Sequence, residues 1–485
     1  MLIATKFPFS NGITLFGLLI ASAFSIAARP ALDRPNVVLI FMDDCGYADF
    51  SHTGNPTIHT PNITRLVAEG LNFPQFYTAS PACSASRYAI LTGRNPARSG
   101  FNWVLSPKSD KHIHTKEVTL AEGLKRRGYA TAMFGKWHLG NPNEANDFTT
   151  DAFPLAHGFD SWIGSNVSND YNPGTDLVRS KRGGTTPVSG YEMIQEDYAL
   201  DDELQGELTR RFSQGAIDFI REQGDNPFFI YLALTMPHLP VHASPEFAGH
   251  SKRGLYGDVI EEIDANVGRI RTALEEAGVA ENTLLVFTSD NGPWIRFQET
   301  ATHDRYGEAR LNIGSALPFR DGKGSTWEGG VRVPGVFWWP GMIKPATVVR
   351  EPASTFDIFP TVFALVGLDL PQDRTLDGRD IRPYLSSDRF EGPVDDFGFI
   401  YTGVPMNAVY GARRGPWKLH VNLYSQTQNN YGFEASRESP ILFHVEHDPS
   451  ERYERATERP QVVRELLDDI EAFETGLEAE GTFWD

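Results

Sequence analysis

The chain has 485 residues, of which 40% are hydrophobic, and its formal charge is −19 at pH 7. This length allows one large domain with a smaller one, or three small domains. The excess of acidic side chains leaves no extended basic surface for a nucleic acid, so any anionic substrate must meet a local positive pocket. The two cysteines, Cys45 and Cys83, are too few for a disulfide framework, and a single bridge between them is the minor alternative.

The N-terminus has the features of a secretory signal peptide. Its first 28 residues carry Lys6 as their only charge, an apolar run from Ile13 to Ile20, and small residues just before Arg29. We therefore predict a signal peptide over residues 1–28, with an uncleaved membrane anchor as the alternative. Because no later apolar run is long enough to span a bilayer, we expect the mature protein in the periplasm or the medium, with no membrane partner.

Alternating strand and helix signals predict an α/β fold. Three apolar runs are typical of buried parallel strands, namely Val37–Met42, Phe228–Leu234 and Leu284–Thr288. Helix signals, including a capping box from Thr119 to Glu122, predict helices at about 61–69, 120–127, 204–222 and 256–277. The pattern indicates a mostly parallel sheet with helices on both faces, in which ligands bind beyond the carboxyl ends of the strands.

Two other regions differ from this pattern. The polar stretch from Asn141 to Asp202 has few periodic apolar positions, so we interpret it as long loops beside the ligand crevice. After about Gly392, short strand-like runs and a last helix predict a smaller antiparallel sheet with one helix, at 399–402, 417–422, 441–445 and about 461–477. We accordingly divide the mature chain into a catalytic domain over 29–392 and a C-terminal α+β subdomain over 393–485.

Carboxylate and amide side chains follow two of the predicted strands. The first strand runs into Asp43 and Asp44, and the third runs into Asp290 and Asn291. Because the ends of parallel strands meet at one edge of a sheet, these oxygens together suit Ca²⁺ or Mg²⁺. The alternative is that the aspartates cap a helix and that the second segment is an ordinary turn.

Cys83 precedes a predicted helix that stops at Gly93, with Ser84 or Ser86 as its N-terminal cap. A helix N-terminus favours anions and lowers the pKa of a thiol. Arg87 would lie one turn further on, where it can hold an anionic intermediate. The alternative is a buried structural cysteine.

The segment Cys83-Ser-Ala-Ser-Arg87, followed by Leu91-Thr-Gly-Arg94, resembles the signature of the type I sulfatases of the alkaline phosphatase superfamily. Ala85 departs from the proline that many members carry there. The resemblance extends over most of the chain, through Asp43-Asp-Cys-Gly-Tyr47, Gly135-Lys-Trp-His-Leu-Gly140, Pro237-His-Leu-Pro240, Ser289-Asp-Asn-Gly292 and Gly322-Lys-Gly-Ser-Thr-Trp-Glu-Gly-Gly330. It implies an alkaline-phosphatase-like fold.

The resemblance also implies the nucleophile and the metal. A formylglycine-generating maturation enzyme would oxidise Cys83 to formylglycine, whose hydrated aldehyde attacks sulfur and forms a covalent sulfate intermediate. The implied metal is Ca²⁺, with Mg²⁺ as the alternative, and the implied ligands are Asp43, Asp44, Asp290, Asn291 and the modified Cys83. Their oxygens agree with this, because zinc prefers thiolate and imidazole.

Further roles follow from the same resemblance. Lys136, Lys323 and His238 would surround the sulfate oxygens, and His238 would also protonate the leaving alcohol. His138 would take the proton whose loss releases sulfate, while Arg87 would stabilise the hydrated aldehyde. Taken alone, these lysines and histidines would be interpreted as surface charges and hydrogen-bonded loop histidines.

We expect a sulfatase similar to the arylsulfatase and N-acetylgalactosamine-sulfatase branch, acting on a sulfated sugar or polysaccharide. The sugar rests on the predicted export, on the polar loops, and on Trp162, Tyr171 and Trp294 as aromatic side chains that could stack on sugar rings. One alternative is a phosphonate monoester or phosphodiester hydrolase of the same superfamily. Another is a non-catalytic secreted carbohydrate-binding protein. His242 and His303 are interpreted as ordinary loop residues, with substrate contact as the alternative.

Overall fold

The computed structural model describes residues 34–101, 103–142, 150–181, 190–295, 312–390, 394, 397–403, 408–426 and 430–485. The predicted signal peptide and His303 lie outside these residues. Residues Arg34–Asp485 form one compact unit, and the predicted boundary at residue 392 within it stays a prediction. Among the described segments, no helix is long and apolar enough to cross a membrane.

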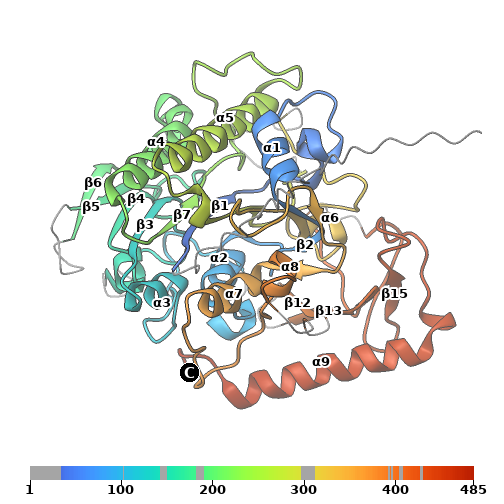
Figure 1. The fold of residues 1–485 in the computed structure, drawn as a ribbon. Coiled ribbons are helices and arrows are strands. Elements are labelled where there is room, and N and C mark those ends of the chain that lie inside the picture. The colour runs from blue at the N-terminus through green and yellow to red at the C-terminus, as the bar shows by residue number, and fades with distance from the viewer. Residues whose placement is uncertain are drawn as a thin grey trace, which may run out of the picture. The chain divides into compact units, whose positions relative to one another are not determined.

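A mixed, mostly parallel sheet forms the centre of this unit (Figure 1). In spatial order its strands are β10 (Thr347–Val348), β2 (Leu71–Tyr77), β9 (Arg332–Trp338), β8 (Thr283–Ser289), β1 (Asn36–Met42), β7 (Phe228–Ala233), β3 (Ala130–Gly135), β4 (Ser161–Ser165), β5 (Leu177–Ser180) and β6 (Tyr191–Gln195), and β11 (Ala353–Ser354) pairs with β2. Strands β8, β1, β7, β3 and β4 are parallel to one another, whereas β9, β5 and β6 pair antiparallel with their neighbours. The predicted sheet class is confirmed.

The three strands predicted from apolar runs lie side by side at the middle of the sheet. Every residue of β1, β7 and β8 is buried. These strands have continuous rather than alternating apolar sequences because helices cover both of their faces. Each fully buried Leu, Ile, Val or Phe side chain contributes roughly 1.5–3 kcal/mol to this core.

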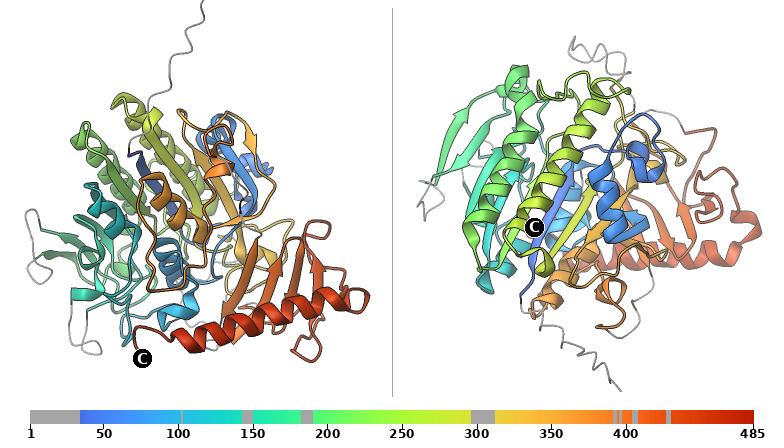
Figure 2. Two further views of the ribbon diagram at one scale, coloured as in Figure 1. Left: turned by 60° about the horizontal axis from the view of Figure 1, so that its bottom comes forward. Right: turned by 45° about the horizontal axis from the view of Figure 1, so that its top comes forward.

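Helices form one layer on each face of the sheet (Figures 1 and 2). One layer contains α1 (Pro61–Glu69), α4 (Asp202–Gln223) and α5 (Leu255–Glu276), and the other contains α2 (Cys83–Thr92), α3 (Leu120–Arg126) and α7 (Ile358–Leu365), with the short helices α6 (Glu328–Val331) and α8 (Arg382–Leu385) in the connections. The predicted capping box begins α3, since Thr119 Oγ1 accepts from the Glu122 N–H at 3.1 Å and Glu122 Oε2 accepts from the Thr119 N–H at 2.7 Å.

The prediction of loops alone between Asn141 and Asp202 is wrong, because β4, β5 and β6 extend the sheet there. These strands have only four or five residues, too few for a clear alternating pattern. Trp162 in β4 is 2% exposed, and its indole N–H donates to the Gly135 oxygen at 3.1 Å. The side chain therefore belongs to the core and cannot stack on a substrate.

A second, antiparallel sheet follows, with the order β12 (Gly398–Gly403), β13 (Ala408–Arg414), β14 (Trp417–His420) and β15 (Ile441–His444). Helix α9 (Pro460–Glu480) runs along it (Figure 2). Leu466 and Ile470 of α9 pack against Leu419 and Leu442 of the sheet. The predicted smaller sheet with one helix is confirmed, although sequence analysis missed β13.

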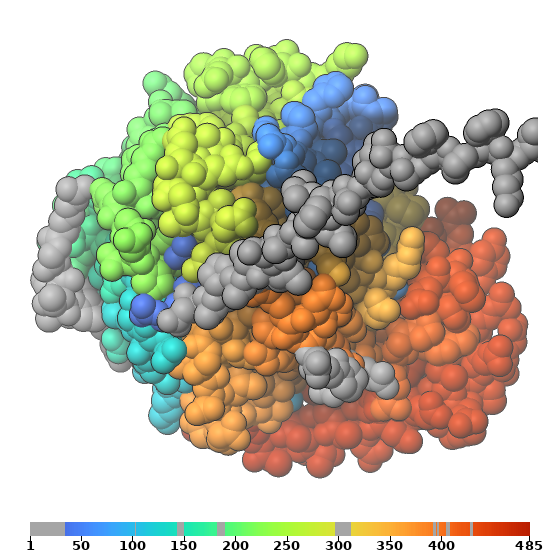
Figure 3. Space-filling model, viewed as in Figure 1, coloured from blue at the N-terminus to red at the C-terminus, as the bar shows by residue number. Residues whose placement is uncertain are grey.

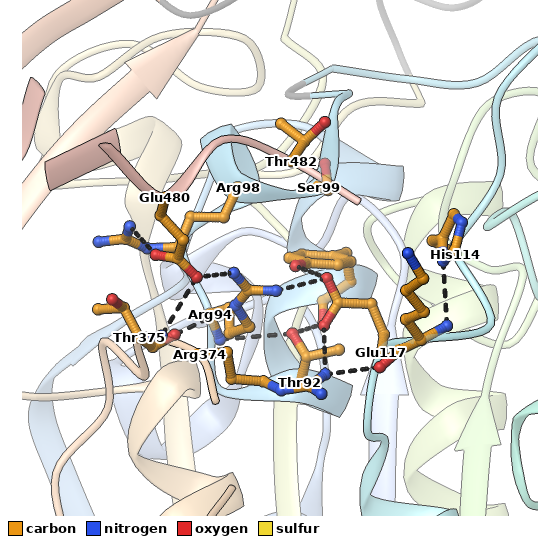
Figure 4. Close-up of polar contacts among 12 residues, drawn as sticks. Thr92, Arg94, Arg98, Ser99, His114, Glu117, Arg374, Thr375, Glu480 and Thr482 are labelled. Carbon is orange, nitrogen blue, oxygen red and sulfur yellow. Dashed lines mark hydrogen bonds and ion pairs between the residues drawn. The ribbon is translucent and has the colours of Figure 1, made fainter. Parts of the chain in front are cut away.

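The end of α9 is tied to the helical layer by ion pairs (Figure 4). The Glu480 carboxylate lies 2.5 Å from Arg94 and 2.8 Å from Arg98, and Arg94 also lies 2.6 Å from Glu117. In the space-filling view, the red residues of α9 border the orange segment that contains α7 and α8 (Figure 3). Thr375 in that segment donates its N–H to Glu480 at 3.2 Å.

Candidate active site

The carboxyl ends of the central strands bring the predicted site residues together. The register pairs Met42 of β1 with Ser289 of β8, so Asp43 and Asp290 leave adjacent strands at one level. On the other side, β1 pairs with β7, and β7 pairs with β3, which runs into Lys136. At Gly135 φ is +105°, and an added Cβ would meet the Ala233 oxygen at 1.8 Å, so only glycine fits this turn.

A buried group of possible metal ligands lies at this edge. Single ligand atoms of Asp43, Asp44, Cys83 and His238 all lie within 4.8 Å of one another. Cys83 Sγ is 3.5 Å from Asp43 Oδ1 and 3.9 Å from Asp44 Oδ1. Asp44 has φ of +61°, an uncommon conformation for a non-glycine residue, which turns its side chain back into the group.

Asp290 and Asn291 extend from β8 and bond to Asp44, although Asp290 is not one of the four residues of this group. Asp290 Oδ1 accepts from the Asp44 N–H at 3.0 Å, and Asn291 Nδ2 donates to Asp44 Oδ1 at 2.7 Å. The buried Oδ1 of Asn291 has no hydrogen-bond partner within the described residues. A buried acceptor without a donor is costly, so this oxygen suits a cation.

The carboxylates themselves favour a bound cation. Burial and the neighbouring Asp43 carboxylate raise the pKa of Asp290 to about 8, against the opposing charge of Arg87. Three carboxylates this close cannot all ionise readily without added positive charge. A hard divalent cation fits their oxygens. His238 Nε2, 3.5 Å from Asp44 Oδ2, lies close enough to be a ligand.

Cationic side chains surround the carboxylates. Lys136 Nζ lies 2.6 Å from Asp43 Oδ2, Lys323 Nζ lies 2.7 Å from Asp44 Oδ2, and Arg87 lies 2.9 Å from Asp290 Oδ2. Although burial opposes it, the charges of Lys136, His238 and Arg87 hold the pKa of Asp43 well below its usual range. Each of the three carboxylates thus has a cationic side chain beside it, and a divalent cation would leave the pocket positive. Such a pocket attracts an anion in an acidic protein.

Cys83 is the first residue of α2, and Ala82 is its N-cap without a side-chain cap bond. The expected caps Ser84 and Ser86 are therefore wrong: both lie inside the helix, where Ser86 Oγ donates to the Ser80 oxygen at 2.7 Å. The expected fall in thiol pKa is also wrong, because burial raises the pKa of Cys83 well above its usual value despite Lys136 and Lys323. Cys45 and Cys83 are unbridged and buried.

His138 follows β3 and Lys136 and has an uncommon backbone conformation for a non-glycine residue, with φ of +55°. The ring is buried, and its centroid lies 6.2 Å from that of Tyr171. Burial and the charges of Lys136 and Arg87 hold the pKa of His138 well below its usual value. These influences favour the neutral imidazole, which keeps a lone pair on one ring nitrogen.

Sequence analysis missed Ser168 as a site residue. Its Oγ lies 3.2 Å from Lys136 Nζ and 3.3 Å from His238 Nε2, so it joins two predicted sulfate-binding groups. It follows β4, and the signal that could have revealed it was the short strand hidden in the expected loop. Trp294 also stands at the site, with Lys323 Nζ 4.4 Å from its ring centroid and the His238 ring 5.3 Å away.

The fold and the site together define an α/β protein with a buried group of possible metal ligands at the ends of its central strands. Residues 35–368 match the family Sulfatase. The mouse N-acetylgalactosamine-6-sulfatase is 36% identical over 90% of this chain and 85% of its own length, and mouse steryl-sulfatase is 34% identical over 94% and 84%. A solved sulfatase from Pseudoalteromonas sp. has a TM-score of 0.76 and 27% identity, covering 92% of this chain and 91% of that one. The chain belongs to the sulfatase family and is a sulfuric ester hydrolase.

Proposed function

We propose that this sulfatase hydrolyses sulfate esters of a sugar or polysaccharide through formylglycine made from Cys83, with Ca²⁺ as its metal. The observation that carries the proposal is the position of Cys83. It begins α2 with its Sγ 3.5 Å from Asp43, inside a ring of carboxylates that Arg87, Lys136 and Lys323 neutralise.

Asp43, Asp44, Asp290 and Asn291 would hold the cation. Asp43 and Asp44 belong to the buried group of possible ligands, Asp290 and Asn291 bond to Asp44, and the Asn291 Oδ1 lacks a donor among the described residues. When bound, Ca²⁺ would supply positive charge for the nucleophile and the sulfate oxygens. Mg²⁺ is the alternative, because the same hard oxygens suit it.

The protein's own residues then divide the work. Oxidised Cys83 would supply a hydrated aldehyde with two hydroxyl groups, and Arg87 would orient it. One hydroxyl would attack sulfur and form a new S–O bond as the bond to the alcohol breaks, and water would hydrate the aldehyde again once sulfate has left. Lys136 and Lys323 would stabilise charge on the sulfate oxygens as the ester bond breaks. His238 would donate a proton to the departing alcohol, and neutral His138 would take a proton from the second hydroxyl so that sulfate leaves.

A sugar is favoured over a steroid by two features of the chain. The predicted signal peptide implies export to the periplasm or the medium, where sulfated polysaccharides are available. The formylglycine-generating enzyme would have modified Cys83 beforehand. Tyr171 and Trp294 stand beside His138 and His238, and aromatic rings of this kind stack on sugar faces. The name of the mouse N-acetylgalactosamine-6-sulfatase agrees with a 6-sulfated amino sugar as the first candidate.

Peptide mass spectrometry of active protein tests the nucleophile. We expect the Cys83 peptide to be about 18 Da lighter than cysteine predicts, the change from thiol to aldehyde. The variant Cys83→Ala should lose turnover of an aryl sulfate while folding normally, whereas the matched buried variant Cys45→Ala should keep most of it. Unmodified Cys83 in fully active enzyme would exclude the proposal.

A substrate panel tests the rest. Rates on 6-sulfated N-acetylgalactosamine, a sulfated polysaccharide, a steryl sulfate and a phosphonate monoester should be highest for one of the sulfated sugars. Higher rates on the steroid or the phosphonate would overturn the substrate assignment and leave the formylglycine assignment to the mass measurement.

A further inference from the structure

A buried network of charged side chains lies where the C-terminal sheet meets the chain that carries Lys323. At its centre, Lys418 Nζ of β14 lies 3.0 Å from Glu328 Oε1 and 3.1 Å from Glu451 Oε1, and all three side chains are fully buried. His420 Nε2 lies 2.8 Å from Glu451 Oε1. We call this the Glu328 network, and it consists of Glu328, Arg332, Lys418, His420, Glu451 and the hydroxyl of Tyr77.

The segment 322–330, which we call the Lys323 loop, joins separate parts of the active site. The Lys323 N–H donates to the Pro293 oxygen and the Gly324 N–H donates to the Pro81 oxygen, each at 2.9 Å. The Gly330 oxygen accepts from the Gly292 N–H at 2.9 Å. The loop is therefore bonded both to the chain after Asn291 and to the chain before Cys83.

The Glu328 network holds this loop at its far end, where α6 begins. Glu451 Oε2 accepts from the Glu328 N–H at 2.7 Å. The Glu328 carboxylate accepts from Tyr77 Oη at 2.6 Å and pairs with Lys418 and Arg332. The His420 ring lies 4.5 Å from that of Trp327, also in the loop.

Buried ion pairs of this kind seldom add more stability than apolar packing would, because desolvating the charges costs about as much as their attraction returns. What they do supply is direction, since each bond requires one geometry of donor and acceptor. The Lys323 loop needs such a fixed geometry, because Lys323 must meet the sulfate oxygens.

We propose that Lys418 and Glu451 are positioning residues of the sulfatase, which hold Glu328 and the Lys323 loop so that Lys323 reaches the sulfate. The C-terminal sheet is then part of the machinery for turnover and not only a support for the fold. This inference rests on the proposed role of Lys323 in binding sulfate.

A double-mutant cycle on the full-length, matured enzyme separates positioning from general support. With Lys323 present, Lys418→Met should lower kcat/KM on an aryl sulfate by about 100-fold, the effect of displacing a binding group by about 1 Å. In a Lys323→Ala background the same change should cost less than about threefold, because the group it positions is gone. Competitive inhibition by inorganic sulfate should weaken in parallel.

A matched control is a buried carboxylate that joins two helices instead. Asp264 accepts from the Ile63 N–H at 2.8 Å and from Asn62 Nδ2 at 2.8 Å, and it is 2% exposed. Asp264→Asn should lower the melting temperature but leave kcat/KM per folded molecule unchanged.

If Lys418→Met does not fold, Glu451→Gln takes its place in a second double-mutant cycle. The amide oxygen of the new side chain can still accept from the Glu328 N–H, while one charge is lost.

The outcomes are distinct. A similar loss of kcat/KM from Lys418→Met, or from Glu451→Gln in its place, with and without Lys323 would mean that the network supports the fold in general. That result would overturn the inference. Normal kinetics in that variant, with Lys323→Ala impaired, would overturn it as well. Normal kinetics in Lys323→Ala itself would instead refute the proposed role of Lys323, on which the inference rests.

Discussion

The main-chain oxygen of Leu105 lies 2.7 Å from Nε2 of His138. A carbonyl oxygen can only accept, so Nε2 carries the proton, and Nδ1 of the neutral ring is left with its lone pair. This Nδ1 is buried and has no hydrogen-bond partner in the described part of the chain. The Leu105 carbonyl thus selects the tautomer that a base at Nδ1 requires.

Replacement of His138 should stop the reaction after its first half. Without the base, His138→Ala should release one equivalent of alcohol per active site and then turn over at least about 100-fold more slowly. Rapid-quench measurement of alcohol and sulfate checks this, since alcohol should appear in a burst without matching sulfate. The control variant His242→Ala should show neither effect. A uniformly slow reaction without a burst would contradict the assigned role.

Removal of the cation should weaken both activity and stability. After chelation we expect activity to fall to background and the melting temperature to drop, because a ligand at 100 times its Kd stabilises the folded state by about 2.7 kcal/mol. Titration with Ca²⁺ and with Mg²⁺, followed by thermal unfolding, identifies the metal. Asn291→Ala should need more cation for the same shift. An unchanged melting temperature in all of these conditions would exclude the site.

Acid should weaken the Glu328 network. Burial opposes ionisation, yet the charges of Lys418 and Arg332 lower the pKa of Glu328 to about 2. Because the folded pKa lies below the unfolded value, this stabilisation is present above about pH 4.5 and is lost as the pH falls toward 2. The full loss of stability amounts to about 3 kcal/mol, of which about 2 kcal/mol is lost by pH 3.

Urea unfolding of the native protein and of Glu328→Gln between pH 7 and pH 3 measures this effect. The difference in unfolding free energy between the two proteins should be constant down to about pH 5 and shrink below it. The exposed control Glu222→Gln should differ from the native protein by a small, constant amount. A difference that does not change with pH would show that the Glu328 charge is not held by the network.

The end of α9 should matter for stability because Glu480 joins Arg94, Arg98 and the Thr375 N–H (Figure 4). Glu480→Ala leaves the 2% exposed Arg94 with Glu117 and the Thr375 oxygen, and so with one carboxylate fewer. We expect a loss of about 2 kcal/mol, less than a fully buried pair because the Glu480 side chain is 21% exposed. Thermal or urea unfolding checks it against the exposed neighbour Glu478→Ala, and equal stability of the two variants would contradict the prediction.

Sequence patterns predicted the centre of the fold better than its margins. Strands β1, β7 and β8 are continuous apolar runs because both of their faces are covered, and such runs are visible without any structure. Strands β4, β5 and β6 are short, and β5 and β6 are partly exposed, so polar residues obscure them. Trp162 was misjudged for the same reason, since only the pairing of β4 with β3 shows that it faces the core.

By itself, the sequence determined the α/β class, the smaller C-terminal sheet and the residues at the strand ends. Local periodicity and the polar residues that follow apolar runs can be recognised in the sequence alone. Tertiary structure decided which groups meet. Ser168 joins Lys136 to His238, Leu105 orients His138, and Lys418 reaches Glu328 from 90 residues away. Burial reversed the expected pKa of Cys83. These contacts and pKa values depend on distance and solvent exclusion in three dimensions, which no pattern along one chain contains.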